Sequence, residues 1–223
     1  MLRYPMNMSV AGRVIVVVGG GRVAGRKLRL LEGTGAALRI VAAAPSDEVR
    51  TWAAARADLV EARFEPHHLD GAFAAIAATD RRDTNAAVVS AARARGVLVN
   101  VADDPDASDF HVPAVLRRGR LTVALSTGGA CPGFSHALKE WLDGLIGPEV
   151  ATALEVVAAA RERLRQDGPP PRQAYERLVG DALFEACRRR DEAALDRLLA
   201  DTLGPAVTAA SLGVTSLLDG GSP

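Results

Sequence analysis

The chain has 223 residues, enough for one medium domain or two small ones, and its 48% apolar and 24% charged residues allow a substantial hydrophobic core. This composition excludes disorder, a collagen helix and a coiled-coil rod. Because 27 basic residues balance 27 acidic ones, the net charge of zero offers no general attraction to nucleic acid or to an anionic membrane. We expect neither as a partner, so any anionic ligand must be held by local groups.

Targeting and redox signals are weak. The first apolar run, Val14 to Val18, is too short for a secretion signal, and no stretch approaches the roughly 20 apolar residues of a membrane span. Cys131 and Cys187 are too few and too far apart for a disulfide framework or a zinc knuckle. We therefore expect a soluble, cytoplasmic protein with two reduced thiols.

The first 102 residues alternate short apolar runs with longer segments of helical period, which is typical of a parallel sheet with helices on both faces. Gly35 and Gly96 fall just past two of the expected helices, where a left-handed cap favours glycine. The predicted strands are 13–18, 37–42, 58–62, 72–78 and 97–101, and the predicted helices are 22–34, 46–56 and 84–95.

After Phe110 the pattern changes. Residues 111–127 predict two strands joined by a turn at Arg118-Gly119, which is a hairpin, and residues 132–146 predict a helix. From Pro148 onward every segment is helical, with a break at the Gly-Pro-Pro-Pro run of residues 168–171. The sequence therefore predicts an α/β protein with a Rossmann-type domain over 1–110, a hairpin-and-helix segment over 111–147 and a small all-α domain over 148–223.

A glycine loop follows the first predicted strand. Residues 19–24 read Gly-Gly-Gly-Arg-Val-Ala, a G-x-G-x-x-A pattern that opens a helix. Gly19 permits a tight turn, Gly21 lets a pyrophosphate approach the backbone, and the small Ala24 lets the helix pack closely enough to point its first amides at the phosphates. The pattern predicts a bound dinucleotide, and a purely structural tight turn is the alternative.

The rest of the expected cofactor site is less regular. The second strand lacks the acid that commonly binds the adenosine ribose, so Ala43 and Ala44 would hold adenosine by shape and backbone groups, and spacing does not choose between NAD and NADP. Thr79 ends the fourth strand as a further candidate contact. Asp80 is either another contact or, with Thr84, a cap of the next helix.

An acidic turn ends the fifth strand at the same edge, beside the expected nicotinamide position. Residues 100–105 read Asn-Val-Ala-Asp-Asp-Pro. Repulsion between the adjacent carboxylates of Asp103 and Asp104 favours a raised proton affinity in one of them, which suits a general base. The alternative is an ordinary Asp-Pro turn.

A second glycine loop, Ser126-Thr127-Gly128-Gly129-Ala130-Cys131-Pro132, opens another helix with proline at its first position. Its hydroxyls and amides predict an anion site for a carboxylate-rich substrate. We interpret Cys131 as a small packing residue rather than a nucleophile. The four histidines lack metal-ligand spacing, and His111 is the one worth testing because it lies close to Asp103 in the chain.

Together these motifs resemble the precorrin-2 dehydrogenase and sirohydrochlorin ferrochelatase family, the N-terminal module of siroheme synthases. The resemblance covers residues 4–146 and is carried by Tyr4-Pro5, VVVGGGRVAGRKLRLL, AAIAATD, NVADDPDASDFHVPA and LSTGGACP. It implies oxidation of precorrin-2 to sirohydrochlorin with NAD as the hydride acceptor. In bifunctional members ferrous iron is then inserted as a second substrate, giving siroheme.

The resemblance also implies roles for residues. Asp103 becomes the catalytic acid-base residue and a transient iron contact, and Asn100 joins residues 126–129 as a substrate contact. The family's cofactor, NAD, is expected on the glycine loop and the end of the second strand. Segment 111–147 would form a homodimer. The expected cofactor contacts are Gly19, Gly21, Arg22, Val23, Ala43, Ala44, Thr79 and Asp80.

Two departures concern Cys131, where many members have Ser, and His111, where an aliphatic residue is common. Two rival functions stay open. One is a dehydrogenase without chelatase activity, and the other is a Rossmann NAD-sensing regulatory module. Fused family members also carry a methyltransferase domain, and we expect another protein to perform that methylation.

Overall fold

The structure is a computed structural model that describes residues 4–165 and 172–218. Contacts between residues divide the chain into two units, 1–112 and 113–223, and each is described here by itself. The predicted break at residues 168–171 lies outside the described residues. No helix of the described parts is long and apolar enough to cross a membrane.

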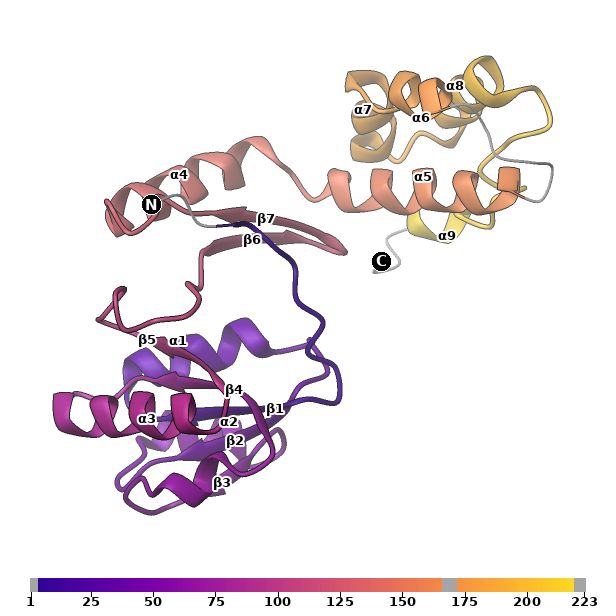
Figure 1. The fold of residues 1–223 in the computed structure, drawn as a ribbon. Helices are drawn as coiled ribbons and strands as arrows, with labels where there is room; N and C mark the ends of the chain where they lie inside the picture. The colour runs from indigo at the N-terminus through magenta and orange to yellow at the C-terminus, as the bar shows by residue number, and fades with distance from the viewer. Residues whose placement is uncertain (1–3, 166–171, 219–223) are drawn as a thin grey trace. The chain divides into compact units, whose positions relative to one another are not determined.

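The first unit is built on a five-stranded sheet in the order β3-β2-β1-β4-β5, and all its pairings are parallel (Figure 1). The strands are β1 Val14–Val18, β2 Ala37–Val41, β3 Asp58–Val60, β4 Ala72–Ala77 and β5 Leu98–Val101. This order brings the carboxyl ends of β1, β4 and β5 side by side, and ligands bind open parallel sheets at that edge.

Helices cover both faces of this sheet, which explains the uninterrupted apolar strands. In β1, Val16 and Val18 belong to the core that includes α3, whereas Ile15 and Val17 belong to the core that includes α1 and α2. The helices of the unit are α1 Arg22–Leu31, α2 Asp47–Ala53, the short 3-10 helix η1 Pro66–Leu69 and α3 Arg82–Ala94.

The helix boundaries differ from the predicted ones by a few residues. Both α1 and α2 end three residues earlier than expected. Gly96 follows α3 with φ of +66° as predicted, whereas Gly35, also left-handed, lies in the turn beyond α1 rather than at its cap. In contrast, α3 begins at Arg82 and not at Thr84.

The second unit begins with the predicted antiparallel hairpin, β6 Ala114–Arg118 and β7 Leu121–Leu125, followed by α4 Pro132–Leu145. Arg118 ties the end of α4 to β6, because its Nε donates to the Ile146 carbonyl at 2.7 Å and its guanidinium pairs with Asp143 at 3.0 Å. A hairpin with one helix is a small structure to stand alone.

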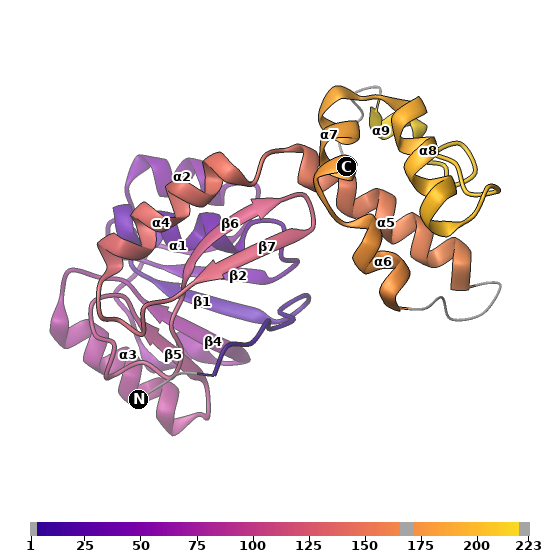
Figure 2. The same ribbon diagram turned by 90° about the horizontal axis from the view of Figure 1, so that it is seen from above.

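The remaining helices gather around one apolar core (Figure 2). Glu149, with 8% of its side chain exposed, pairs with Arg188 at 2.7 Å and joins the first of these helices to α7. The predicted fold class, a Rossmann-type sheet, a hairpin segment and a helical C-terminal region, is confirmed. These helices are α5 Glu149–Arg165, α6 Arg172–Leu178, α7 Asp181–Arg189, α8 Glu192–Leu203 and α9 Thr215–Leu218.

Candidate functional site

Two glycines of the first loop are required by the protein itself. Gly19 has φ of +128°, and a Cβ there would lie 2.4 Å from the Ala78 carbonyl oxygen at the end of β4. A Cβ on Gly20 would lie 2.5 Å from the Cα of Pro45, beyond β2. The loop is therefore wedged between the ends of the two strands that flank β1. Sequence analysis anticipated the tight turn at Gly19 but missed the close approach at Gly20.

Gly21 is different, because packing does not require it. Its φ of −93° suits any residue, and a Cβ there would meet nothing within 4 Å. As the N-cap of α1 it provides no side-chain hydrogen bond, and the first helical bond runs from Gly25 N to Gly21 O at 3.0 Å. The amides of residues 22–24 therefore have no helical acceptor, which leaves them free for an anion. This geometry fits a dinucleotide pyrophosphate.

The flanks of the loop are open. Arg22 and Val23 are exposed, whereas Ala24 is fully buried against the sheet as the close packing of α1 requires. Ala43 and Ala44, just beyond β2, are also exposed. The predicted pyrophosphate and adenosine contacts thus lie at the carboxyl ends of two paired strands, β1 and β2.

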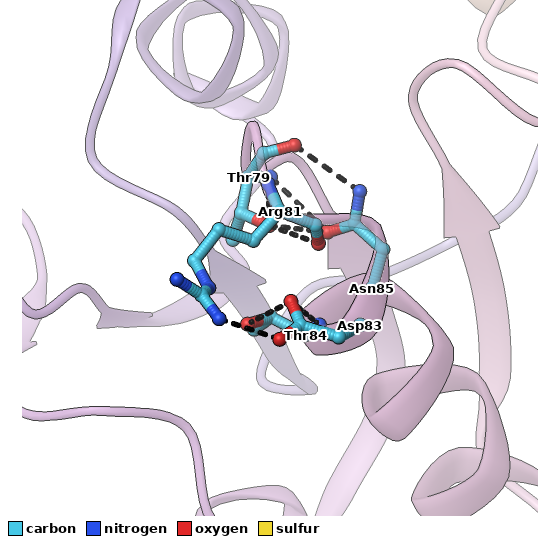
Figure 3. Close-up of polar contacts among 5 residues, drawn as sticks. All are labelled: Thr79, Arg81, Asp83, Thr84 and Asn85. Carbon is cyan, nitrogen blue, oxygen red and sulfur yellow. Dashed lines mark hydrogen bonds and ion pairs between the residues drawn. The ribbon is translucent and has the colours of Figure 1, made fainter.

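Thr79, just beyond β4, is held by Asn85 of α3 (Figure 3). The Asn85 Oδ1 accepts from the Thr79 hydroxyl at 2.7 Å and from its backbone N–H at 3.2 Å, and the Asn85 Nδ2 donates to the Thr79 carbonyl at 3.1 Å. Asn85 is only 4% exposed. Sequence analysis missed it, and the signal was a polar residue on the apolar face of a helix.

The alternative in which Asp80 and Thr84 cap the next helix is wrong. The N-cap of α3 is Arg81, which makes no side-chain cap hydrogen bond. The Thr84 amide donates instead to Asp83 Oδ1 at 2.7 Å, and Asp83 also pairs with Arg81 (Figure 3). Asp80 lies one residue before this N-cap and Thr84 lies within the first turn of the helix, so neither residue is at the cap position. Asp80 is exposed, and its contact with a cofactor stays a prediction.

The two carboxylates of the acidic turn have separate environments. Asp104 Oδ1 accepts from the amides of Asp106 at 3.1 Å and Ala107 at 3.0 Å, so Asp104 shapes the turn. Asp103 is exposed, and within the described residues its carboxylate has no hydrogen bond or ion pair. The turn interpretation therefore describes Asp104, while Asp103 is available for chemistry.

The segment after this turn covers the free edge of β5. Val99 N donates to Asp109 Oδ2 and Val101 N to Ser108 Oγ, both at 2.9 Å. Asn100, 4% exposed, donates to the Phe110 carbonyl at 2.9 Å, and its buried Oδ1 has no partner among the described residues. The structure thus places Asn100 inside the wall of the site, and its contact with substrate stays a prediction.

Asp103 and Asp104 of the turn both line a cavity of about 780 Å³. The cavity lies between one face of α3 and the turn after β5, and it does not include the glycine loop. Its lining residues are Arg82, Asn85, Ala86, Val89, Ser90, Arg93, Val101, Asp103, Asp104 and Ala107.

The second glycine loop belongs to the other unit. Ser126 Oγ accepts from Gly128 N and Thr127 Oγ1 accepts from Cys131 N, both at 3.2 Å. Gly128 and Gly129 are exposed and left-handed. Pro132 opens α4 as predicted, but the prediction that Cys131 packs in the interior is wrong, because it is the exposed N-cap of that helix.

The histidines are scattered through the described chain. The His111 Nε2 lies 3.3 Å from the Pro105 carbonyl oxygen, which places the ring beside the acidic turn. In the ranges that the structure covers, no group of three or more His, Cys, Asp or Glu side chains is placed to hold a metal ion.

Comparison with known proteins finds similarity along most of the chain. Residues 6–114 match the protein family described as putative NAD(P)-binding. Siroheme synthase 1 of Aeromonas salmonicida is 37% identical over 204 residues, covering 89% of this chain and 43% of that protein. Siroheme synthase of Methylococcus capsulatus is 40% identical over 195 residues, covering 84% and 41%. The chain thus spans less than half the length of these relatives.

Among solved structures, the fold is similar to that of SirC, precorrin-2 dehydrogenase, with a TM-score of 0.70 and 23% identity, covering 88% of this chain and 98% of that one. At 23% identity this similarity indicates the fold alone. The siroheme synthase relatives match at the higher sequence identities of 37% and 40%. The match to the NAD(P)-binding family and the siroheme synthase relatives therefore support the precorrin-2 dehydrogenase and sirohydrochlorin ferrochelatase family that the motifs indicate.

Proposed function

We propose that this protein oxidises precorrin-2 to sirohydrochlorin with NAD, and that Asp103 is its acid-base residue. The observation that carries the proposal is the free carboxylate of Asp103. It follows β5, which pairs with β4, and the end of β4 packs against Gly19 of the glycine loop. Asp103 thus follows β5, and only β4 separates this strand from β1, which leads into the glycine loop. Both lie at the edge where open parallel sheets bind their ligands.

The cofactor contacts follow the carboxyl edge of the sheet. The amides of residues 22–24 bind the pyrophosphate, and the open space at Gly21 lets it approach. Ala43 and Ala44 would hold the adenosine, and Thr79 and Asp80 are further candidate contacts at the same edge of the sheet. NAD supplies the hydride acceptor of the reaction.

Asp103 accepts a proton from the macrocycle as the hydride departs. An exposed carboxylate without a hydrogen-bond partner can approach a substrate proton without first breaking a contact within the described chain. Residues 126–129 offer amides and hydroxyls to carboxylate groups of the substrate. Asn100 supports the acidic turn that carries Asp103, because its side chain donates a hydrogen bond to the Phe110 carbonyl beyond that turn.

A second activity, insertion of ferrous iron into sirohydrochlorin, extends the proposal. Iron is here a substrate that passes through the site, and Asp103 is its transient contact because carboxylate oxygens accept iron briefly. The siroheme synthase relatives support this extension by their names. A dehydrogenase without this activity is the alternative that the experiment below separates. We place the reaction in the cytoplasm, where NAD is available.

We also propose a homodimer formed through segment 111–147. Three large apolar side chains follow one face of α4: Phe134, Trp141 and Leu145, which are 58%, 62% and 60% exposed. Exposed apolar stripes of this kind mark protein interfaces. The hairpin beside α4 gains stability from any further layer that covers it.

One anaerobic experiment tests the function. Purified protein is incubated with precorrin-2 and NAD, and ferrous iron is added later, while NADH and macrocycle absorbance are followed separately. NADH followed by siroheme supports both activities. NADH without siroheme identifies a dehydrogenase alone, and NAD binding without NADH would contradict the enzyme proposal in favour of a sensor.

A further inference from the structure

The cavity beside Asp103 is a groove with an apolar floor and a charged rim. Val89 of α3 and Val101 of β5, 9% and 5% exposed, form its floor. Asp103 and Asp104 stand on the side of the turn. A volume of about 780 Å³ lies within the roughly 300–1,000 Å³ of small-molecule sites.

Two arginines stand on the opposite side of the groove, at the two ends of α3. Arg82 and Arg93 are eleven residues apart, so about 1.5 Å of rise per residue separates them by about 16 Å along the helix. Both are exposed. The groove is therefore long enough to meet a broad, flat ligand along one edge.

The two arginines differ in their contacts. Arg93 donates to the Ala107 carbonyl at 3.3 Å and so ties the acidic turn to α3. Across the part of the chain that the structure describes, the Arg82 guanidinium has no hydrogen bond or ion pair. Its neighbour Arg81, in contrast, pairs with Asp83 at 2.5 Å. Arg82 is thus a cation that no described carboxylate neutralises, at the rim of a groove.

This arrangement selects a particular ligand chemistry. Apolar residues on the floor favour a flat, apolar ring, the arginines favour carboxylates, and the carboxylates of Asp103 and Asp104 favour N–H donors. A polycarboxylated tetrapyrrole combines all three groups. A nucleotide or a simple anion would leave the aspartates facing negative charge.

We propose that this groove binds one edge of the macrocycle, with Arg82 and Arg93 holding its carboxylate arms while its ring faces Asp103. The proposal rests on the proposed function, and it assigns part of the binding of that function's substrate to α3. It adds a binding surface to the contacts that the glycine-loop motifs predicted.

Arg82→Gln tests it directly, because that side chain has no hydrogen bond or ion pair to lose within the described protein. We expect its dissociation constant for the macrocycle to rise roughly fivefold, as for an exposed ion pair, and further in the double variant Arg82→Gln/Arg93→Gln. Arg82→Lys retains most of the binding. Added salt weakens binding by wild type more than by the double variant, because the double variant lacks the two arginine charges that salt screens in wild type.

The probe is uroporphyrin, a fluorescent octacarboxylate, titrated into the full chain beside coproporphyrin, which carries half as many carboxylates. Arg63→Gln is the matched control: Arg63 is exposed and follows β3, at the opposite edge of the sheet. NAD affinity, measured by calorimetry, reports on the intact fold and is expected to stay unchanged in every variant. Tighter binding of uroporphyrin than of coproporphyrin by wild type supports the groove.

The outcomes separate this proposal from the function. If the double variant binds uroporphyrin as wild type does, or keeps the wild-type KM for precorrin-2, the groove assignment is overturned while the dehydrogenase stands. If wild type binds uroporphyrin through the arginines but forms no NADH from precorrin-2, the groove is supported and the function fails. Absence of uroporphyrin binding by wild type also overturns the groove.

Discussion

Asn85 holds Thr79 through three hydrogen bonds, and this links helix α3 to the edge of the sheet where the glycine loop lies. The backbone that Asn85 fixes is the one against which Gly19 packs, since a Cβ on Gly19 would lie 3.2 Å from the Thr79 nitrogen. A side chain of α3 thereby sets the position of the turn that precedes the pyrophosphate amides.

Replacing Asn85 by Ala removes this link. We expect the free energy of unfolding to fall by about 1–3 kcal/mol, because buried partners lose their hydrogen bonds, and NAD affinity to fall several-fold. Calorimetric titration with NAD and urea unfolding measure the two effects. Thr84→Ala, one residue before Asn85 and outside this link, is the matched control. Wild-type NAD affinity in folded Asn85→Ala would contradict the positioning role.

Two glycine substitutions separate packing from ligand binding. Gly21→Ala places a Cβ in open space, so we expect stability to change by less than about 1 kcal/mol while NAD affinity drops at least tenfold. Gly19→Ala places a Cβ against the Ala78 carbonyl at positive φ and should cost at least about 2 kcal/mol of stability. Thermal unfolding and NAD titration of both variants provide the test, and Gly21→Ala with normal NAD affinity would refute the pyrophosphate assignment.

The parallel sheet and the glycine loop could be predicted because their signals are local. An uninterrupted apolar strand such as residues 14–18 indicates burial on both faces, and the glycines follow it directly. The start of α3 was harder to predict, because Asp80 is a residue type that favours the N-cap, whereas the helix has Arg81 at its N-cap and makes no side-chain cap hydrogen bond there.

Other features depend on contacts that sequence does not display. The bonds from Asn85 to Thr79 form only when α3 folds back on β4. Cys131 looked like a packing residue by size, but its place as N-cap of α4 turns it to solvent. The distinction between Asp103 and Asp104 depends on which carboxylate reaches the amides of residues 106 and 107.

His68 predicts how stability responds to acid. It is 8% exposed, and its Nδ1 accepts from the Glu65 amide at 2.9 Å, so the ring is held neutral. Burial and the neighbouring His67 lower its pKa from the usual 6.5, outweighing the opposite effect of Glu65. Because the pKa of His68 is lower in the folded than in the unfolded protein, its contribution to stability is fully present above pH 6.5. This contribution is lost as the pH falls from 6.5 through the folded pKa.

Denaturant unfolding across this pH window measures that loss, and His68→Gln should show a smaller slope than wild type. His67→Gln, at the exposed neighbour, is the control for removal of a histidine charge. An unchanged slope in His68→Gln would show that other groups cause the acid sensitivity.

The apolar face of α4 predicts the oligomeric state. Burying a tryptophan side chain stabilises an interface by about 1.5–3 kcal/mol, so we expect Trp141→Glu to weaken a homodimer at least tenfold. Sedimentation equilibrium measures this, with Glu140→Gln, also exposed on α4, as the control. A wild-type protein that sediments as a monomer at micromolar concentration would contradict the homodimer.

The most direct test of the central claim is NADH formation by Asp103→Asn from precorrin-2 under anaerobic conditions. The account predicts a rate at least about a hundredfold below wild type, with NAD affinity unchanged, because the proton acceptor is lost. Asp104→Asn keeps the oxygen that binds the amides of residues 106 and 107 and should retain most of the activity. NADH formation at the wild-type rate by Asp103→Asn would remove this carboxylate from the chemistry.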